Sequence, residues 1–196
     1  MTDTRNADLT FGATDYLVYM APRDTVAPTG IADPGVGWVN LGWVTTDGGT
    51  LKVDEESKDI EAAGSLEPIR TLMTKSTKTV QATFLEGLNP HVRSLFDNVA
   101  IDALEPTTDV ATYALPDKPS DLRYAFIFDT IDGDKRIRLY APNGKVTDRG
   151  DEKPQTDDVM GVDMTLKFYK GAGNSAAVTR TIKYGGVDVS AHFPAP

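Results

Sequence analysis

The chain has 196 residues, of which 40% are hydrophobic and 25% are charged, and its formal net charge is -9 at pH 7. This composition is ordinary for one globular domain with a real core, and it excludes a chain that is disordered throughout. An acidic surface repels phosphate groups, which argues against ordinary nucleic-acid binding. The negative charge does not exclude a protein that acts on DNA without binding it tightly.

The chain contains no cysteine, which excludes disulfide bonds, thiolate zinc sites and thiol catalysis. The first ten residues, MTDTRNADLT, are polar and do not resemble a signal peptide. No apolar run approaches the ~20 residues that a membrane helix needs. We therefore expect a protein that is made and folded in the cytoplasm and does not bind membranes.

Most of the chain is predicted to form β-strands. The region 23–37 is rich in proline and glycine and is expected to be a loop. Hairpin turns are predicted at Asp47-Gly48-Gly49 and at Asp132-Gly133-Asp134. Runs of aromatic and β-branched residues indicate strands at 15–20, 38–45, 50–53, 123–131, 135–140 and 177–184.

Two further strands show strict alternation of apolar and polar residues, which indicates one buried and one wet face. The first half of 69–85 is polar on both faces, so we expect it to extend beyond the core of its own subunit. In 159–170 the apolar positions are Met160, Val162, Met164, Leu166 and Phe168, and the polar face carries Gly161, Asp163, Thr165 and Lys167. In the second half of 69–85, Val80, Ala82 and Phe84 alternate with Gln81 and Thr83.

One helix is predicted at 90–99, about three turns long. Asn89 is a good N-cap, and Pro90 suits the first helical position, where no backbone donor is needed. A single apolar stripe should pack this helix on one side of the sheet, and it consists of Val92, Leu95, Phe96 and Val99. The predicted fold is mainly β, a β-sandwich or open barrel with one packed α-helix and a long inter-strand loop.

The predicted loop covers residues 54–66, which are polar and acidic and have no apolar periodicity. Long polar loops between strands are uncommon unless they have a function. Nothing in this loop resembles a catalytic site, so we predict that it contacts a neighbouring subunit. The candidate contact residues are Asp54, Glu55, Glu56, Lys58, Asp59 and Glu61.

The sequence gives little support for a catalytic or cofactor-binding function, and we predict no catalytic residue, metal site or cofactor. Residues 171–176 match the letters of a dinucleotide-binding G-x-G-x-x-A, but a strand-like run follows where that motif needs a helix. Acidic clusters near Asp129 and Asp157 lack the spacing of an EF-hand, and a calcium role stays open. Trp38 and Trp43 could form a sugar platform, although buried anchors are the commoner use of such residues.

Five segments follow one another in a fixed order across about 15–184: DYLVYMAP, GWVNLGWVTTDGGTLKVDEES, IRTLMTKSTKTVQATFLEG, NPHVRSLFDN and VMGVDMTLKFYKG. In this order of elements the chain resembles the major tail tube proteins of long-tailed (siphovirus-type) bacteriophages. Because these proteins have no catalytic signature, the resemblance rests on the order of the elements, the length of the loop and the general character of the segments. We expect one domain, 1–196, with an N-terminal arm at 1–13, a C-terminal tail at 185–196 and no added immunoglobulin-like domain.

The resemblance implies hexameric rings that stack into a hollow tube, which conducts double-stranded DNA without binding it specifically. Strands of each subunit would join an inner barrel, the helix would pack outside it, and 54–66 would reach adjacent rings. Further partners would be tail proteins at the tube ends, in a virion assembled in the host cytoplasm. The candidate lumen residues are Asp163, Thr165, Lys167, Gln81 and Thr83.

Two points stay open at this stage. The mixed Asp163 and Lys167 face could instead pair neighbouring subunits, although the overall charge of -9 favours a negative lining that repels phosphates. A tube subunit of a contractile secretion-type apparatus and a monomeric β-sandwich carbohydrate-binding module are the alternative functions.

Overall fold

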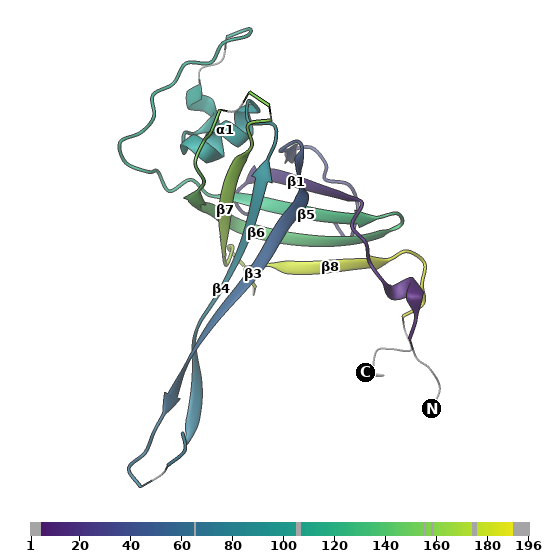
Figure 1. Cartoon of the computed structure of the whole chain (residues 1–196), viewed down its shortest axis with the longest axis vertical. Coiled ribbons are helices and arrows are strands. Elements are labelled where there is room, and N and C mark those ends of the chain that lie inside the picture. Colours follow the sequence, from purple (N-terminus) through teal and green to yellow (C-terminus); the bar gives the residue numbers. More distant parts are fainter. Residues whose placement is uncertain are drawn as a thin grey trace.

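The computed structural model describes residues 5–64, 66–104, 107–154, 156–157, 159–173 and 176–189 (Figure 1). It is mainly β, with 46% strand and 8% helix, so the predicted fold class is confirmed. The strands are β1 Asp15–Pro22, β2 Val39–Asn40, β3 Val44–Ile60, β4 Arg70–Phe84, β5 Tyr124–Asp132, β6 Lys135–Arg149, β7 Val162–Tyr169 and β8 Thr179–Tyr184. The helix is α1 Pro90–Asp97, and short 3-10 turns lie at Ala7–Leu9 and Ile101–Leu104.

All strands belong to one antiparallel sheet in the order β2-β1-β5-β6-β7-β4-β3, and β8 pairs with β6. The long strand β6 joins the two halves of this sheet. Its first part lies between β5 and β8, and its last part pairs with β7. The sheet curls there, so β1, β5 and β8 run across the direction of β3, β4 and β7 (Figure 1).

The chain between β2 and β3 bridges the open side of the curled sheet. The Leu41 amide donates to the Val18 carbonyl at 2.9 Å, and the Leu85 amide donates to the Trp43 carbonyl at 2.8 Å. These two hydrogen bonds link the β1 edge to the end of β4. The result is an open barrel rather than two separate sheets.

One hydrophobic core fills this barrel and draws on both halves of the sheet. Every second residue of β7 is buried, as the alternation predicted. Aromatic rings contact one another across the core, with the Phe128 and Phe168 centroids 5.8 Å apart and those of Phe126 and Phe128 6.1 Å apart. Such pairs add to the stabilisation that comes from burying the rings.

The helix begins where the sequence predicted. The Asn89 side chain accepts a hydrogen bond from the His91 amide at 3.0 Å, and Pro90 occupies the first turn. The helix ends at Asp97 because Asn98 takes the left-handed conformation, with φ of 56°. Of the predicted stripe, Val92, Leu95 and Val99 are buried and Phe96 packs against the core.

The predicted loop at 54–66 is wrong in its first half, because residues 54–60 belong to β3 and pair with β4 from Thr77 back to Arg70. Pairing of β4 with β7 starts only at Lys78, so 54–60 of β3 and 70–77 of β4, with the described residues between them, form a two-stranded arm that projects from the body (Figure 1). Both faces of the arm are exposed to solvent. The sequence therefore has no apolar alternation there, although the backbone is extended.

The turn predicted at Asp47-Gly48-Gly49 is also wrong, since these residues lie within β3. Val44 pairs with Phe84, and the next paired residue of β3, Gly49, pairs with Ala82. Five residues of β3 thus span the same distance as two residues of β4, and the extra residues form a bulge. A Cβ on Gly49 would lie 2.0 Å from the Tyr16 hydroxyl oxygen, and Gly48 has φ of 65°. Gly48 and Gly49 therefore allow the bulge and the close approach of Tyr16. The turn predicted around Gly133 is confirmed, since it joins β5 to β6.

The N-terminal segment runs beside the β5–β6 turn. The Gly12 amide donates to the Asp132 carboxylate at 3.0 Å, and the Thr14 amide donates to the Ile131 carbonyl at 2.8 Å. Of the predicted C-terminal tail at 185–196, the part 190–196 lies outside the described residues. Among the residues that are described, no helix is long and apolar enough to span a membrane.

Candidate assembly surfaces

The five candidate lumen residues share one face of the sheet. Thr83 is opposite Asp163 and Gln81 is opposite Thr165 in the β4–β7 register, and directly opposed residues point to the same side. The other side of these strands carries the core. Extending the register to β3 and β6 defines a polar face that consists of Thr50, Lys52, Asp54, Glu56, Lys75, Thr77, Thr79, Gln81, Thr83, Lys145, Asp148, Asp163, Thr165 and Lys167.

The Asp163 carboxylate is engaged within its own subunit. The Gln81 side-chain amide donates to one of its oxygens at 2.9 Å, and the Thr83 hydroxyl donates to the other at 3.4 Å. Both donors come from the neighbouring strand β4. These two hydrogen bonds hold the Asp163 side chain against β4 of its own subunit.

The polar face has no net charge. Its four lysines, Lys52, Lys75, Lys145 and Lys167, balance its four carboxylates, Asp54, Glu56, Asp148 and Asp163, so four minus four gives zero. The expected negative lining is therefore not supported, because the excess acidic charge of the chain lies on other surfaces. A whole-chain charge says nothing about where the charges lie.

Neighbouring charges on this face neutralise one another locally. Lys52 and Asp54 form an ion pair at 3.0 Å, and Lys75 contacts Glu56, whose hydrogen bond raises the pKa of Lys75. Lys145 pairs at 2.9 Å with Asp121, which lies just before β5. These exposed pairs contribute little stability, but they leave few lysines free to bind phosphate.

The four-strand layer β6–β7–β4–β3 ends in two unpaired edges. Within the described part of the chain, β3 pairs with β4 alone along its length past the bulge. At the other side, the pairing of β5 with β6 ends at Gly144, so residues 145–149 of β6 pair only with β7. Unpaired edges of this kind are templates for pairing with another chain.

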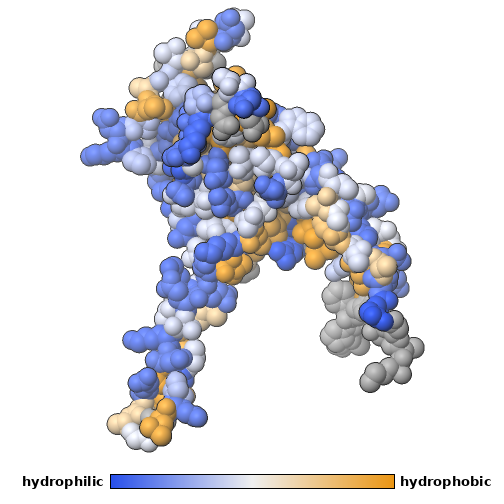
Figure 2. Space-filling view, viewed as in Figure 1, coloured by the Kyte–Doolittle hydropathy of each residue, from blue (hydrophilic) through white to orange (hydrophobic). Residues whose placement is uncertain are grey.

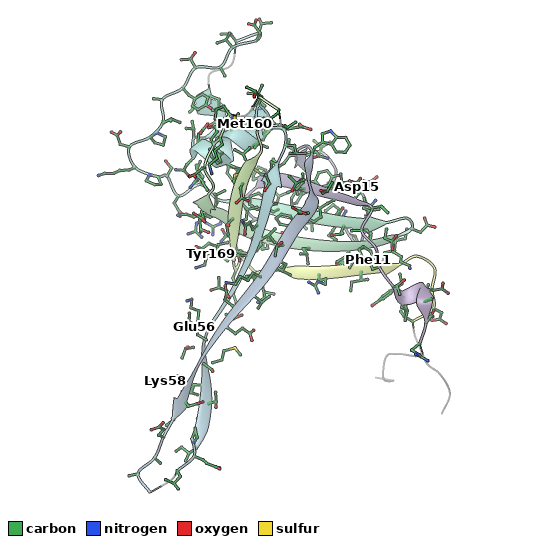
Figure 3. All side chains as sticks on the ribbon, in the orientation of Figure 1. Phe11, Asp15, Glu56, Lys58, Met160 and Tyr169 are labelled. Carbon is green, nitrogen blue, oxygen red and sulfur yellow. The ribbon has the colours of Figure 1, made fainter. Side chains whose placement is uncertain are left out.

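The predicted contact residues of 54–61 lie on the arm, where Figure 3 labels Glu56 and Lys58. Several of them make cross-strand contacts inside the arm. The Thr71 hydroxyl donates to the Asp59 carboxylate at 2.6 Å, and the Ser76 hydroxyl to that of Glu55 at 3.5 Å. These contacts hold the two strands of the arm together.

The sequence reasoning missed the end of the arm, which is apolar (Figure 2). Leu66 is fully exposed, and Ile69, Leu72 and Met73 are 62%, 36% and 65% exposed. We call these four residues the apolar tip. The sequence did contain a sign of this patch, because these four apolar residues stand in a run that is otherwise polar. Apolar residues with no core nearby need an explanation, and an interaction surface is one.

The two tryptophans do not form one platform. Trp38 contacts the Tyr140 ring edge-on, with centroids 6.3 Å apart, whereas Trp43 is 71% exposed and lines a cavity beside Glu86. In the described ranges, no three acidic or histidine side chains are grouped to hold a metal ion. Burial lowers the pKa of His91.

The G-x-G-x-x-A segment lacks the helix that a nucleotide site needs, because β8 follows it. Residues 174–175 of this segment lie outside the described residues, as do Asp158 and His192. Asp132 accepts the Gly12 amide beside the β5–β6 turn, which is a structural use of this carboxylate.

A family model described as Phage tail tube protein matches residues 4–181, from the N-terminal segment into β8. No match is found among curated proteins. The match takes in the arm, the helix and all four strands of the polar face. The chain therefore belongs to the phage tail tube protein family, whose structural role places it in the virion tail, in assembly with itself and with other tail proteins.

Proposed function

We propose that this chain forms hexameric rings that stack into the tail tube and conduct double-stranded DNA to the host. The observation that carries the proposal is the four-strand layer β6–β7–β4–β3. One of its faces is polar and formally neutral, the other carries the core, and both of its edges are unpaired. The subunits would assemble in the host cytoplasm.

Edge-to-edge pairing would close the ring. The free edge of β3 in one copy would pair with residues 145–149 of β6 in the next, so six copies would give about 24 strands. Strands spaced about 4.8 Å apart and tilted by about 40° give a backbone diameter of about 48 Å. Such a barrel has an open channel, and its closure removes both exposed edges.

The polar face would line this channel. Each phosphate that a lysine neutralises releases counterions and strengthens binding, so a lining with free lysines would hold DNA back. Here the lysines of the face are balanced by carboxylates, and the positions between them are mostly threonine. A neutral lining with partnered charges would let DNA pass without specific binding.

The arm would provide the contact between rings, through Asp54, Glu55, Glu56, Lys58, Asp59 and Glu61 among others. Asp54 and Glu56 lie where β3 leaves the body, so they would belong both to the mouth of the channel and to the contact with the next ring. From 54 to 60 the β3 strand adds seven residues beyond the body, which is about 24 Å at the rise of an antiparallel strand. No described residue of the arm pairs with β7, so the two strands of the arm are free to lie against another copy.

Cryo-electron microscopy of the concentrated purified protein tests this proposal. We expect tubes with six subunits per ring, the polar face inward and the β3 edge paired with a neighbouring β6. A chain that stays monomeric at high concentration, both alone and with the tail-tip proteins of its virion, would refute the tube role. Tubes whose inner wall is formed by other strands would refute the assignment of the lining.

A further inference from the structure

Among the residues that the structure describes, the side chains of the apolar tip are left exposed within their own subunit. The tip lies at the start of β4, and this strand runs 15 residues from Arg70 to Phe84 before it reaches the far side of the body. At the rise of a β-strand this is about 45 Å. Any apolar surface at the other end of the strand is therefore out of reach for the tip of the same copy.

Such a surface exists at the far end of β4. Trp43, Leu88 and Val159 are 71%, 86% and 62% exposed there. Together with Leu85 and Met160 they form what we call the apolar rim. Figure 3 labels Met160 at the end of the body opposite the arm.

The rim is hollowed by two cavities that meet at Glu86. One of about 470 Å³ is lined by Leu85, Leu88, Val159 and Met160, and the other of about 370 Å³ by Trp43, and Glu86 lines both. The Glu86 carboxylate accepts a hydrogen bond from the backbone amide of Trp43 at 3.1 Å, which holds this part of the backbone beside Glu86. The rim is therefore a hollowed surface that has apolar walls at Leu85, Leu88, Val159 and Met160 and the Glu86 carboxylate at its centre.

We infer that the apolar tip of one copy docks into the apolar rim of a copy in the adjacent ring. This inference rests on the proposed tube and names the residues of its inter-ring contact. The tip is convex, the rim is concave, and both are apolar and exposed in the isolated subunit. Because the two patches differ and lie at opposite ends of the subunit, their contact is head-to-tail, and its repetition builds an open filament.

The contact also explains why so much apolar surface is exposed. A soluble monomer rarely keeps a hollowed surface with apolar walls at one end and four exposed apolar side chains at the other. One tip–rim contact is small, but a ring with several identical contacts binds its neighbour with high avidity.

Cysteine cross-linking tests the contact directly, because the chain has no cysteine of its own. Ile69→Cys and Leu88→Cys subunits are mixed, assembled and treated with a short bismaleimide, with Val159→Cys as a second rim position. We expect cross-linked dimers from tip–rim mixtures. Leu115→Cys is the control, since Leu115 is 68% exposed but belongs to neither patch.

A second measurement uses Ile69→Glu and Leu88→Glu, with Leu115→Glu as the matched control. A carboxylate buried among apolar groups is costly, so each test variant should raise the critical concentration for tube formation by roughly tenfold or more while the subunit stays folded. If tubes form without tip–rim cross-links at either rim position, or if both glutamate variants assemble like the control, the inference is wrong and the tube role stands. If the unaltered chain forms no tubes, the proposed function itself fails.

Discussion

An ion pair between Asp129 and Arg138 is buried in the body, and its loss should be costly. Both residues are at most 1% exposed. The guanidinium donates from Nε and Nη2 to the two carboxylate oxygens at 2.7 and 2.6 Å, and from Nη1 to the Ala32 carbonyl at 2.7 Å. Arg138 thus joins β5 and β6 to the loop that follows β1.

Arg138→Met removes the charge and leaves the Asp129 carboxylate buried. The nearest remaining cation is Arg136, whose Nη1 is 3.7 Å from a carboxylate oxygen and gives no second hydrogen bond of comparable geometry. Removing one member of a buried pair costs about 3–5 kcal/mol. For a chain of 196 residues, this corresponds to a fall in Tm of about 6–20 °C.

Urea unfolding of the unassembled subunit measures this loss. The double variant Asp129→Leu with Arg138→Met should be less destabilised than Arg138→Met alone, because no unpaired charge is left in the core. Lys75→Met is the control, since it breaks the exposed pair with Glu56 and should leave the urea midpoint almost unchanged. A loss below about 1 kcal/mol for Arg138→Met would show that Asp129 finds other partners.

Three further predictions concern the arm, the polar face and acid stability. Replacing residues 55–76 with an Asn-Gly turn between the paired residues Asp54 and Thr77 should leave the circular dichroism of the body intact and abolish tubes in electron micrographs; normal tubes would contradict an inter-ring role. Asp163→Lys changes the formal charge of the polar face from zero to +2, so tubes should form but DNA release should slow at low salt, with Asp163→Asn intermediate. Failed assembly would instead make it an interface residue. Hydrogen bonds from Arg123 and Lys145 hold the pKa of Asp121 at about 2. The ionised carboxylate therefore stabilises the fold above its unfolded pKa of ~3.9, and this stabilisation is lost as the pH falls towards 2. Asp121→Asn should flatten that part of an acid unfolding curve.

Sequence reasoning succeeded where one face of an element is buried. The alternation in β7 and the cap at Asn89 depend on local contrasts between neighbouring residues, and the structure reproduces both. The polar face followed from the same alternation, because the residues between buried positions must point the other way. Pairing of β7 with β4 then placed Asp163 opposite Thr83, a long-range relation that no spacing in the sequence reveals.

The sequence-based predictions were wrong where one residue type fits two local structures, or where neither face of a strand is buried against a core. Asp47-Gly48-Gly49 has the composition of a hairpin turn, but the same glycines make a bulge and a place for Tyr16. Residues 54–60 show no alternation of apolar and polar residues, because both faces of the arm are exposed to solvent. A strand and a loop therefore have the same sequence pattern there. The charge of the polar face could not be predicted, since it depends on which four strands are neighbours.

A single strand, β4, connects the core of the subunit with the surface proposed for assembly. From Lys78 to Phe84 it pairs with β3 and β7 and contributes Val80, Ala82 and Phe84 to the core, whereas before Lys78 it pairs only with β3. Because the strand is continuous, the direction of the arm is fixed by the packing of its other half. A core variant at Val80 or Ala82 should therefore alter the placement of the apolar tip as well as the stability of the body. The hydrophobic core of one copy would in this way determine how accurately the next ring is placed.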